Sequence, residues 1–269
     1  MKSRLIVAAI GVPLLYLVIL SGFREHIVFA LAIAAACAIA ALELGVMMRP
    51  LAPWVPAGFI PVLLSPLFTW KLGEVGIFLA MLSAIPLLLA FQGLSVEREH
   101  PLPAITATML PIAWIAPAAG LLVIVRQAEA GFGLVILLIA SVFLNDTGAY
   151  FTGRAIGKHK LSPRISPNKS IEGFIGGVTV GTAVLWYGHF IVRIDGDMVL
   201  TGWEAAGIGM AVALATPLGD LFESLVKRAA GVKDSGNVLG EHGGMLDRID
   251  ALLFAIPVFY VGCFFAGAL

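Results

Sequence analysis

The sequence has little charge. Charged side chains make up 13% of its 269 residues, whereas soluble domains average about 25%. Hydrophobic residues make up 59% of the chain, and its mean hydropathy is +0.98. Because these few polar side chains cannot cover a surface that faces water, the chain is expected to face lipid. The formal net charge is zero, which excludes a general electrostatic attraction to nucleic acid.

Cysteine is also scarce. The two cysteines, Cys37 and Cys263, both lie inside apolar runs. This placement argues against a disulfide framework and against a thiolate metal site, and it favours small buried side chains.

Long apolar runs dominate the chain, and a membrane-spanning helix needs about 20 such residues. We expect an all-α, polytopic integral membrane protein with about nine transmembrane helices and no soluble domain. The first helix is expected to be an uncleaved span, because no signal-peptide cleavage site precedes a soluble domain. Pro111 and Pro117 predict a kink or break in the fifth helix. The expected helices are 5–22, 27–47, 54–70, 75–91, 104–125, 131–145, 174–192, 204–222 and 251–267.

The distribution of Lys and Arg predicts the orientation. With the N-terminus in the cytoplasm and nine alternating spans, 13 of the 17 basic residues fall on the cytoplasmic side. The four on the opposite side are Arg24, Lys71, Arg126 and Arg193. Two spans separate the polar segments 145–173 and 220–250, so both segments are expected at the cytoplasmic face, where they can build one site.

The first polar segment combines acidic and basic side chains. Asp146 lies near the end of an apolar helix, where a carboxylate is costly unless it is paired, solvated or bound to a cation. Pro163 and Pro167 prevent the loop from continuing as a helix. Ser170 and Glu172 are placed to cap or begin the next helix, whose free N–H groups favour an anion. Five basic residues follow Asp146, namely Arg154, Lys158, Lys160, Arg164 and Lys169.

Small residues recur in the helix that follows. Gly173, Gly177 and Gly181 are spaced four apart, which predicts close packing between helices rather than a phosphate-binding loop.

The second polar segment carries carboxylates at its two ends. Two residues precede Asp220: Pro217 is expected to free a backbone carbonyl within the eighth span, and Gly219 is expected to let the chain approach a neighbour closely. Asp247 and Asp250 share a face if they are helical. Carboxylates opposite Lys and Arg are what a magnesium-bound polyphosphate requires, since carboxylate oxygens hold the hard cation and basic groups neutralise the phosphates.

Residues 224–250, called the signature segment below, resemble the signature of the phosphatidate cytidylyltransferase (CDP-diacylglycerol synthase) family. The pattern is Ser-x-x-Lys-Arg, Lys-Asp-x-Gly and His-Gly-Gly-x-x-Asp-Arg-x-Asp. It is carried here without departure by Ser224, Lys227, Arg228, Lys233, Asp234, Gly236, His242, Gly243, Gly244, Asp247, Arg248 and Asp250. The upstream stretch from Asn145-Asp146 to Glu172-Gly173 resembles the family too. The resemblance covers residues 104–269 well.

The resemblance implies an activity, cofactors and partners. Members join phosphatidate to CTP, release pyrophosphate and make CDP-diacylglycerol for phospholipid biosynthesis. It implies Mg²⁺, a second, monovalent cation such as K⁺, a homodimer, and a multi-pass protein of the cell inner (cytoplasmic) membrane. We therefore expect N-terminal transmembrane helices in 1–103 and a transmembrane catalytic region in 104–269. The N-terminus and the active site are expected on the cytoplasmic side.

The reaction mainly requires two polyanions to be brought together, which explains the Lys and Arg at one interface and the absence of a Ser/His/Asp triad. Metal ligands are expected among Asp220, Asp247, Asp146 and Asp250. Catalytic residues are expected among Asp220, Lys227, Arg228, His242, Asp247 and Arg248. Contacts to CTP or phosphatidate are expected from Asn145, Arg154, Lys158, Lys169, Ser170, Glu172, Ser224, Lys233 and Asp234.

Three other functions compete with this one. A CTP-dependent lipid-alcohol kinase would transfer the γ-phosphoryl group and release CDP. A CDP-alcohol phosphotransferase is disfavoured because its Asp-Gly-x-x-Ala-Arg motif is absent. A cation-coupled transporter could use Asp146, Asp220 and Glu43, but the chain shows no internal repeat and its ionisable residues gather at one end. Glu43, in the middle of an apolar span, either pairs with another helix or lines a polar cavity.

Overall fold

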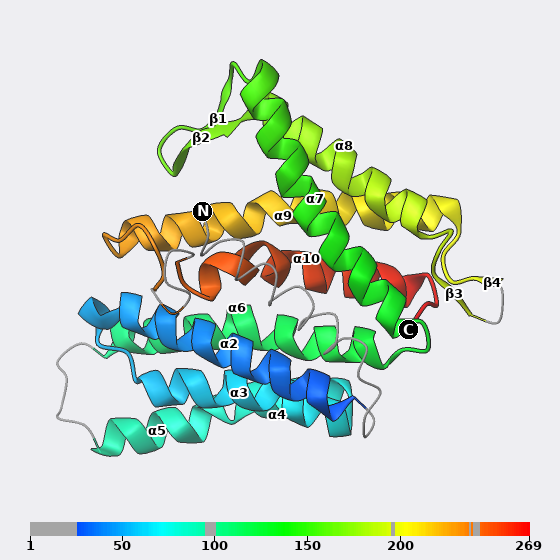
Figure 1. Cartoon of the computed structure of the whole chain (residues 1–269). Helices are drawn as coiled ribbons and strands as arrows, with labels where there is room; N and C mark the ends of the chain where they lie inside the picture. The colour runs from blue at the N-terminus through cyan, green and yellow to red at the C-terminus, as the bar shows by residue number, and fades with distance from the viewer. Residues whose placement is uncertain (1–25, 95–100, 195–196, 237, 239–242) are drawn as a thin grey trace. The chain divides into compact units, whose positions relative to one another are not determined.

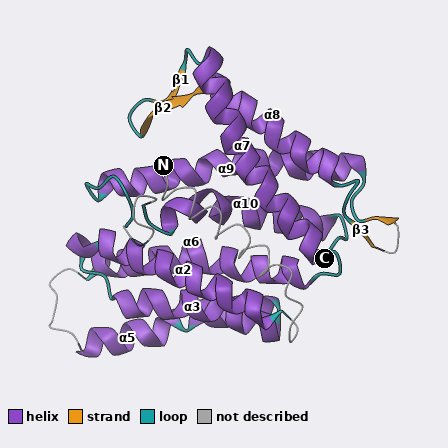
Figure 2. Cartoon of the chain, in the orientation of Figure 1, coloured by secondary structure: helices purple, strands orange, loops and turns teal. Residues whose placement is uncertain are grey.

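The computed structural model describes residues 26–94, 101–194, 197–236, 238 and 243–269. Helices dominate these residues (Figure 1), and the strands form two short antiparallel pairs (Figure 2). The chain divides into two compact units. The first runs to Ile124 and includes Ala230–Arg248, and the second comprises Val125–Ala229 and Ile249–Leu269. The predicted all-α fold class is confirmed.

The first unit is built from helices that pack through small and apolar side chains. Its elements are α2 (Ile27–Met47), the 3-10 turn η1 (Arg49–Leu51), α3 (Val55–Leu72), α4 (Glu74–Leu82), α5 (Ala84–Leu94) and most of α6 (Leu102–Gln127). Two buried hydrogen bonds join α3 to α6. The amide of Trp54, the residue before α3, donates to Thr108 Oγ1 at 2.9 Å, and Ser65 Oγ donates to the Ala116 carbonyl at 2.6 Å.

The two prolines of α6 predicted a kink or a break in this helix, and the prediction of a break is wrong. The helix continues through Pro111 and Pro117 from Leu102 to Gln127. Neighbouring helices and side chains in a membrane protein can satisfy the backbone groups that proline leaves without a partner, so a proline need not end the helix.

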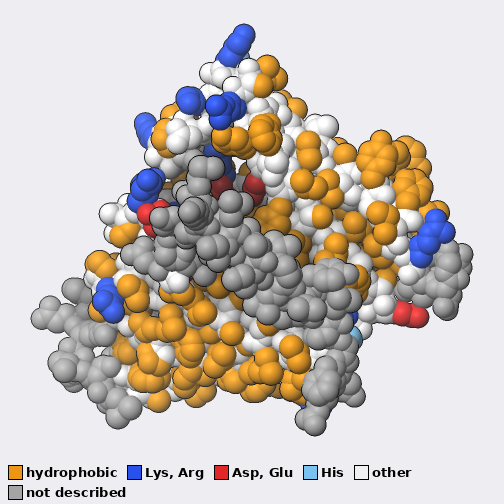
Figure 3. Space-filling model, viewed as in Figure 1, with side chains coloured by type: hydrophobic (Ala, Val, Ile, Leu, Met, Phe, Trp, Pro, Cys, Tyr) orange, Lys and Arg blue, Asp and Glu red, His pale blue; other side chains and the backbone are white. Residues whose placement is uncertain are grey.

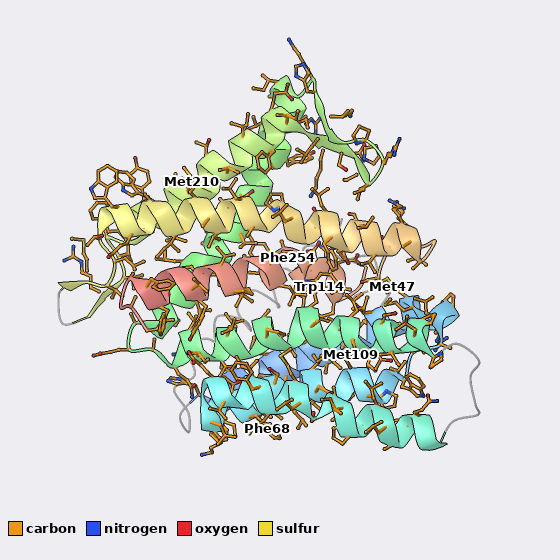
Figure 4. The ribbon with its side chains drawn as sticks, turned by 180° about the vertical axis from the view of Figure 1, so that it is seen from behind. Met47, Phe68, Met109, Trp114, Met210 and Phe254 are labelled. Atoms are coloured by element: carbon orange, nitrogen blue, oxygen red, sulfur yellow. The ribbon has the colours of Figure 1, made fainter. Side chains whose placement is uncertain are left out.

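The second unit contains the two strand pairs. Its elements are α7 (Gly131–Ile156), β1 (Lys160–Ser162), β2 (Ser166–Ser170), α8 (Ile171–Gly188), β3 (Arg193–Ile194), β4 (Asp197–Met198), α9 (Gly202–Ala229) and most of α10 (Leu246–Phe265). Lys160 pairs with Ser170 and Ser162 pairs with Ser166, so β1 and β2 replace the irregular loop that was expected. Phe254 of α10 packs on Phe222 of α9, with ring centroids 5.6 Å apart (Figure 4).

Three helices extend further than predicted. Helix α7 continues beyond residue 145 to Ile156, and α9 continues beyond residue 222 to Ala229. Helix α10 begins at Leu246 rather than at residue 251. The predictions stopped where the apolar run stops. A helix needs apolar residues only where it meets lipid or a core, and its backbone bonds continue into polar sequence.

Seven helices in the described part of the chain are long and apolar enough to cross a membrane. They span 27–47, 55–72, 74–92, 102–127, 131–156, 202–229 and 246–265. The count of nine is not confirmed. The expected span 5–22 lies outside the described residues, and α8, at the position of the expected span 174–192, is not among the seven.

Large apolar side chains remain exposed along these helices. Leu89 of α5 is 69% exposed and Phe265 of α10 is 83% exposed. Hydrophobic side chains cover much of the described surface in Figure 3. Exposing such a surface to water is unfavourable in free energy, whereas contact with the hydrocarbon of a bilayer is not. The chain is therefore an integral membrane protein.

Candidate functional site

A cavity of about 640 Å³ that carries several charged side chains lies within the second unit. Helix α7 supplies one wall through side chains that follow one another at one-turn intervals, and β1, β2, α8 and α9 supply the others. The residues that line it are Asn145, Asp146, Ala149, Tyr150, Gly153, Arg154, Leu161, Ser166, Asn168, Lys169, Ser170, Gly173, Phe174, Pro217 and Asp220. Six of the predicted site residues are therefore brought together: Asn145, Asp146, Arg154, Lys169, Ser170 and Asp220.

An ion pair connects two walls of the cavity. Lys169 Nζ, at the end of β2, lies 2.6 Å from Asp220 Oδ2 on α9. Ser224 Oγ, one turn further along α9, donates to Asp220 Oδ1 at 3.3 Å. Asp146 on α7 is close enough to interact electrostatically with both Lys169 and Asp220. Two carboxylates and an ammonium group thus face one solvent-accessible space.

Arg154 adds a second positive charge to this cavity. Its Nη1 donates to the hydroxyl of Tyr150, one turn earlier on α7, at 2.9 Å. Tyr150 was not predicted as a site residue, because nothing in the sequence distinguishes it from an interfacial aromatic residue. Exposed basic side chains gather around the β1–β2 hairpin in Figure 3. The mixture of carboxylate, ammonium and guanidinium groups suits a phosphate-rich ligand accompanied by a cation.

A second group of charges is buried between α9 and α10. Lys227 Nζ lies 2.6 Å from Glu223 Oε2, and the Glu223 side chain is 1% exposed. Asp250 lies within hydrogen-bonding distance of Glu223, and its Oδ1 accepts from the Ala251 amide at 2.8 Å. The predicted residues Lys227 and Asp250 therefore meet, together with Glu223, which was not predicted.

Gly219 makes this close approach of α9 and α10 possible. A Cβ atom at Gly219 would lie 2.3 Å from the carbonyl oxygen of Asp250. No real side chain tolerates that distance, so only glycine fits here. The close approach predicted for Gly219 is confirmed.

The β1–β2 hairpin is anchored to the start of α8. Ser170 is the N-cap of α8, and its Oγ accepts from the Gly173 amide at 3.1 Å, as predicted. The carboxylate of Glu172 accepts from the Lys158 amide at 3.0 Å and from His159 Nδ1 at 2.6 Å. These hydrogen bonds, led by that from His159, lower the pKa of Glu172 to about 2. Glu172 thus holds the turn after α7.

Small residues bring α7 and α8 together behind the cavity. A Cβ atom at Gly177 would lie 2.6 Å from Asn145 Oδ1, and one at Gly173 would lie 2.8 Å from the Ala149 carbonyl. The predicted role of these glycines in helix packing is confirmed. The buried Asn145 donates from Nδ2 to the Ala213 carbonyl of α9 at 2.8 Å. Asn145 therefore fixes α7 against α9.

In the first unit, the carboxylate of Asp247 lies within hydrogen-bonding distance of three groups. Its Oδ2 accepts from the Gly244 amide at 2.8 Å and from the Ser235 amide at 3.0 Å, and it lies 2.9 Å from Ser235 Oγ. These bonds tie the loop before α10 to the first turn of that helix. Gly243 has a φ of +76°, which only glycine adopts readily.

The carboxylate of Glu43 reaches the same loop from α2. Oε1 accepts from the Met245 amide at 2.9 Å, and Oε2 accepts from the Leu246 amide at 2.9 Å. Glu43 therefore pairs with another segment, one of the two roles considered from the sequence. Its lone charge in an apolar span was the only signal for it.

The remaining predicted site residues lie on the surface or outside the described part. Arg228 and Arg248 are exposed near helix ends, Lys158 is exposed after α7, and Lys233 and Asp234 are exposed in the loop after α9. His242 lies outside the described residues.

The cavity suits a hard divalent cation. Magnesium usually takes one or two carboxylates and completes its shell with water and substrate phosphate oxygens. Asp146 and Asp220 provide such carboxylates in the cavity. Within the described ranges there is no group of three or more His, Cys, Asp or Glu placed to hold a metal, so a cation here would complete its shell with water or with phosphate oxygens of a ligand.

Several proteins named phosphatidate cytidylyltransferase are similar to part of this chain. A stretch of the Aquifex aeolicus (strain VF5) phosphatidate cytidylyltransferase is 40% identical over 149 residues, which is 54% of this chain and 52% of that protein. The protein of the same name from Staphylococcus aureus (strain COL) is 41% identical over 143 residues, or 52% of each chain. That from Staphylococcus saprophyticus is 37% identical over 172 residues, or 64% of each.

The chain thus spans between half and two thirds of the length of these relatives. The model of the cytidylyltransferase family matches a much longer stretch, residues 2–266. The resemblance seen in the signature segment therefore extends through the helices that precede it. The chain belongs to the cytidylyltransferase family.

Proposed function

We propose that this protein is a phosphatidate cytidylyltransferase, which transfers CMP from CTP to phosphatidate and releases pyrophosphate. The main structural support is the cavity within a membrane-embedded helical unit. Its lining brings together two carboxylates and two basic side chains, namely Asp146, Asp220, Lys169 and Arg154. A lipid substrate requires the membrane, and a nucleoside triphosphate requires a polar, charge-balanced site. The names of the relatives support this choice of substrates.

In the proposed reaction a phosphate oxygen of phosphatidate attacks the α-phosphorus of CTP. A new P–O bond forms, and the bond to the β-phosphate breaks so that pyrophosphate leaves with its electron pair. The attacking oxygen is already anionic, so a strong base is not required. The residues mainly overcome the repulsion between two polyanions and stabilise charge on the transferred group.

Lys169 and Arg154 are proposed to bind phosphate oxygens, since both present positive charge to the cavity. Ser224 and Lys169 fix the two oxygens of Asp220. Asp146 and Asp220 are proposed to hold Mg²⁺, which when bound would offset the negative charge of the phosphates. A second, monovalent cation such as K⁺ remains part of the proposal. The metal roles predicted for Asp247 and Asp250 stay predictions, as does the union of both polar segments in one site.

Location and assembly are proposed on the same basis. We propose that the N-terminus and the polar segments lie on the cytoplasmic side of the inner membrane, and the excess of basic residues in the segments assigned to that side supports this orientation. The acyl chains of phosphatidate would stay in the bilayer while its head group enters the cavity. A homodimer is proposed from the family resemblance.

The proposal is tested by incubating the purified protein in proteoliposomes with phosphatidate, CTP and Mg²⁺. Mass spectrometry should find CDP-diacylglycerol, and a coupled assay should find an equal amount of pyrophosphate. Asp220→Asn should abolish both products, whereas Glu74→Gln, at the exposed start of α4, should leave both unchanged. Release of CDP with a phosphorylated lipid, or full activity of Asp220→Asn, would contradict the proposal.

A further inference from the structure

Glu43 is a buried acidic residue that does not line the cavity. It lies on α2 and is 6% exposed, and no step of the proposed reaction uses it. A carboxylate inside an apolar helix is costly unless its environment supplies hydrogen bonds. Its position therefore requires an explanation from its contacts.

Among the described residues, its hydrogen-bond partners lie in the loop that follows α9 and at the start of α10. Both oxygens accept hydrogen bonds from consecutive backbone amides, Met245 to Oε1 and Leu246 to Oε2, each at 2.9 Å. Ser235 Oγ lies 3.2 Å from Oε2. The first N–H groups of a helix have no partner within the helix, so Glu43 supplies from another helix the cap that α10 needs.

Ser235 connects this cap to Asp247. The Ser235 hydroxyl lies 2.9 Å from Asp247 Oδ2 and 3.2 Å from Glu43 Oε2. Its amide also donates to Asp247 Oδ2 at 3.0 Å. The single hydroxyl proton of Ser235 is shared between the two carboxylates, while its amide donates to Asp247 alone. Ser235 therefore links Glu43 to Asp247, and a change at Glu43 would be felt at Asp247.

The space around Glu43 is filled by its partners. A Cβ atom at Gly236 would lie 2.7 Å from Glu43 Oε1, and one at Gly244 would lie 2.5 Å from Oε2. The backbone on both sides of the loop therefore closes directly on this carboxylate. Two of the glycines of the signature segment are explained by this contact.

We propose that Glu43 is a positioning residue: it caps the start of α10 and, through Ser235, fixes the carboxylate of Asp247. The capping role does not depend on which reaction the protein catalyses. Only the kinetic test below rests on the proposed function. No other residue of α2 offers the charged oxygen atoms that two adjacent amides need. A glutamine is a poor replacement, because one of its terminal atoms is a donor and would face other donors.

Hydrogen exchange of the full chain in nanodiscs tests the structural part. In Glu43→Gln, exchange in a peptide that covers residues 243–250 should be faster by roughly 10- to 100-fold, because hydrogen bonds to a charged acceptor are lost. Exchange in α3 should not change. Glu74→Gln, a matched removal of an exposed acid from the same unit, should leave both peptides unchanged. Unchanged exchange in 243–250, or an equal increase in α3, would overturn the proposal.

Ser235→Ala keeps the proposal testable if Glu43→Gln does not fold. It should accelerate exchange in the same peptide by roughly 10-fold and leave α3 unaffected. Combined with Glu43→Gln it should add less than the product of the two single effects, because both act on one chain of hydrogen bonds. Multiplicative effects would show that Ser235 and Glu43 act independently and would overturn the link to Asp247.

The kinetic readout separates positioning from loss of folded protein. Glu43→Gln should raise the Mg²⁺ concentration for half-maximal CDP-diacylglycerol synthesis several-fold, since Asp247 is a predicted metal ligand. If the variant only contained less folded, active protein, kcat would fall and this Mg²⁺ concentration would stay unchanged. That result would contradict the link between Glu43 and Asp247. If the wild-type protein makes no CDP-diacylglycerol, the proposed function fails while the hydrogen-exchange result still decides the role of Glu43.

Discussion

At the scale of single residues, the cavity depends on charges held in place by specific partners. The Lys169–Asp220 pair is partly solvated, with side chains 26% and 36% exposed. Such pairs contribute little to stability, typically about 0–1 kcal/mol. Its importance therefore lies in the position of the two charges beside Asp146 rather than in the energy of the fold.

Lys169→Met should consequently separate activity from stability. The methionine keeps the apolar length of the side chain and removes the ammonium group. We expect kcat/KM for CTP to fall by about 10²–10³-fold, the usual effect of losing a group that stabilises charge in the transition state. The melting temperature should hardly change. Lys160→Met, on the same hairpin but outside the cavity lining, is the control, and a similar loss in that variant would argue against a specific role for Lys169.

The pKa of Glu172 gives a prediction about pH. Because its folded pKa of about 2 lies below its ordinary value of 4.5, the hydrogen bonds to Glu172 stabilise the hairpin fully above pH 4.5. That stabilisation is lost as the pH falls through about 2. The NMR shifts of the Lys158 and His159 amides should therefore stay constant from pH 7 to pH 5 and change with a midpoint near 2. A midpoint near 4.5 would refute the hydrogen-bonded arrangement.

The sequence predicted the cavity residues better than the residues that support them. Asp146, Lys169 and Asp220 were recognised because each is a charge near the end of an apolar run. Glu223 and the partners of Glu43 were not recognised, since Glu43 and Leu246 are 203 positions apart and no local period links them. Glu43 was recognised as unusual because a carboxylate inside an apolar helix is energetically unfavourable, but only the tertiary structure identifies what it binds.

At the scale of secondary-structure elements, the contact between α7 and α8 carries the cavity. Gly173 and Gly177 of α8 face Ala149 and Asn145 of α7, so the two backbones approach closely. Asn145 then joins α7 to α9 through Ala213. The three helices that bear the cavity residues are thus fixed to one another by small side chains and one buried amide.

Gly177→Ala should weaken this contact. The new methyl group would lie 2.6 Å from Asn145 Oδ1, and such overpacking typically costs about 1–3 kcal/mol. We expect the melting temperature in detergent to fall by roughly 2–12 °C. Gly207→Ala in α9, where a Cβ atom would meet nothing within 4 Å, should not lower it. Equal melting temperatures for the two variants would exclude tight packing at Gly177.

The helices themselves were predictable, whereas their ends were not. Apolar length identified α2, α3, α6, α7, α9 and α10 near their observed positions. It could not show that α7 continues through Asp146 to Ile156, because polar residues on a helix that lines a cavity look like loop residues in a sequence. The strands β1 and β2 were missed because Ser166–Ser170 is polar, contains Pro167 and has no alternating pattern.

At the scale of the whole molecule, the proposed topology puts 13 of the 17 basic residues on the cytoplasmic side of the membrane. The native cysteines, Cys37 and Cys263, are buried, so an engineered surface cysteine can report the side on which it lies. Lys160→Cys should react with a membrane-impermeant maleimide from the cytoplasmic side, and Lys71→Cys should react from the opposite side. Labelling of both from one side would contradict the proposed topology.

The central claim is that the α-phosphoryl group of CTP, with its nucleoside, is transferred to a lipid phosphate. The most direct measurement compares CTP labelled with ³²P at the α or at the γ position in proteoliposomes that contain phosphatidate and Mg²⁺. The account predicts that the α label enters the lipid and the γ label leaves as pyrophosphate, and that Asp220→Asn does neither. Transfer of the γ label to the lipid, or no transfer of either label by the wild-type protein, would contradict it.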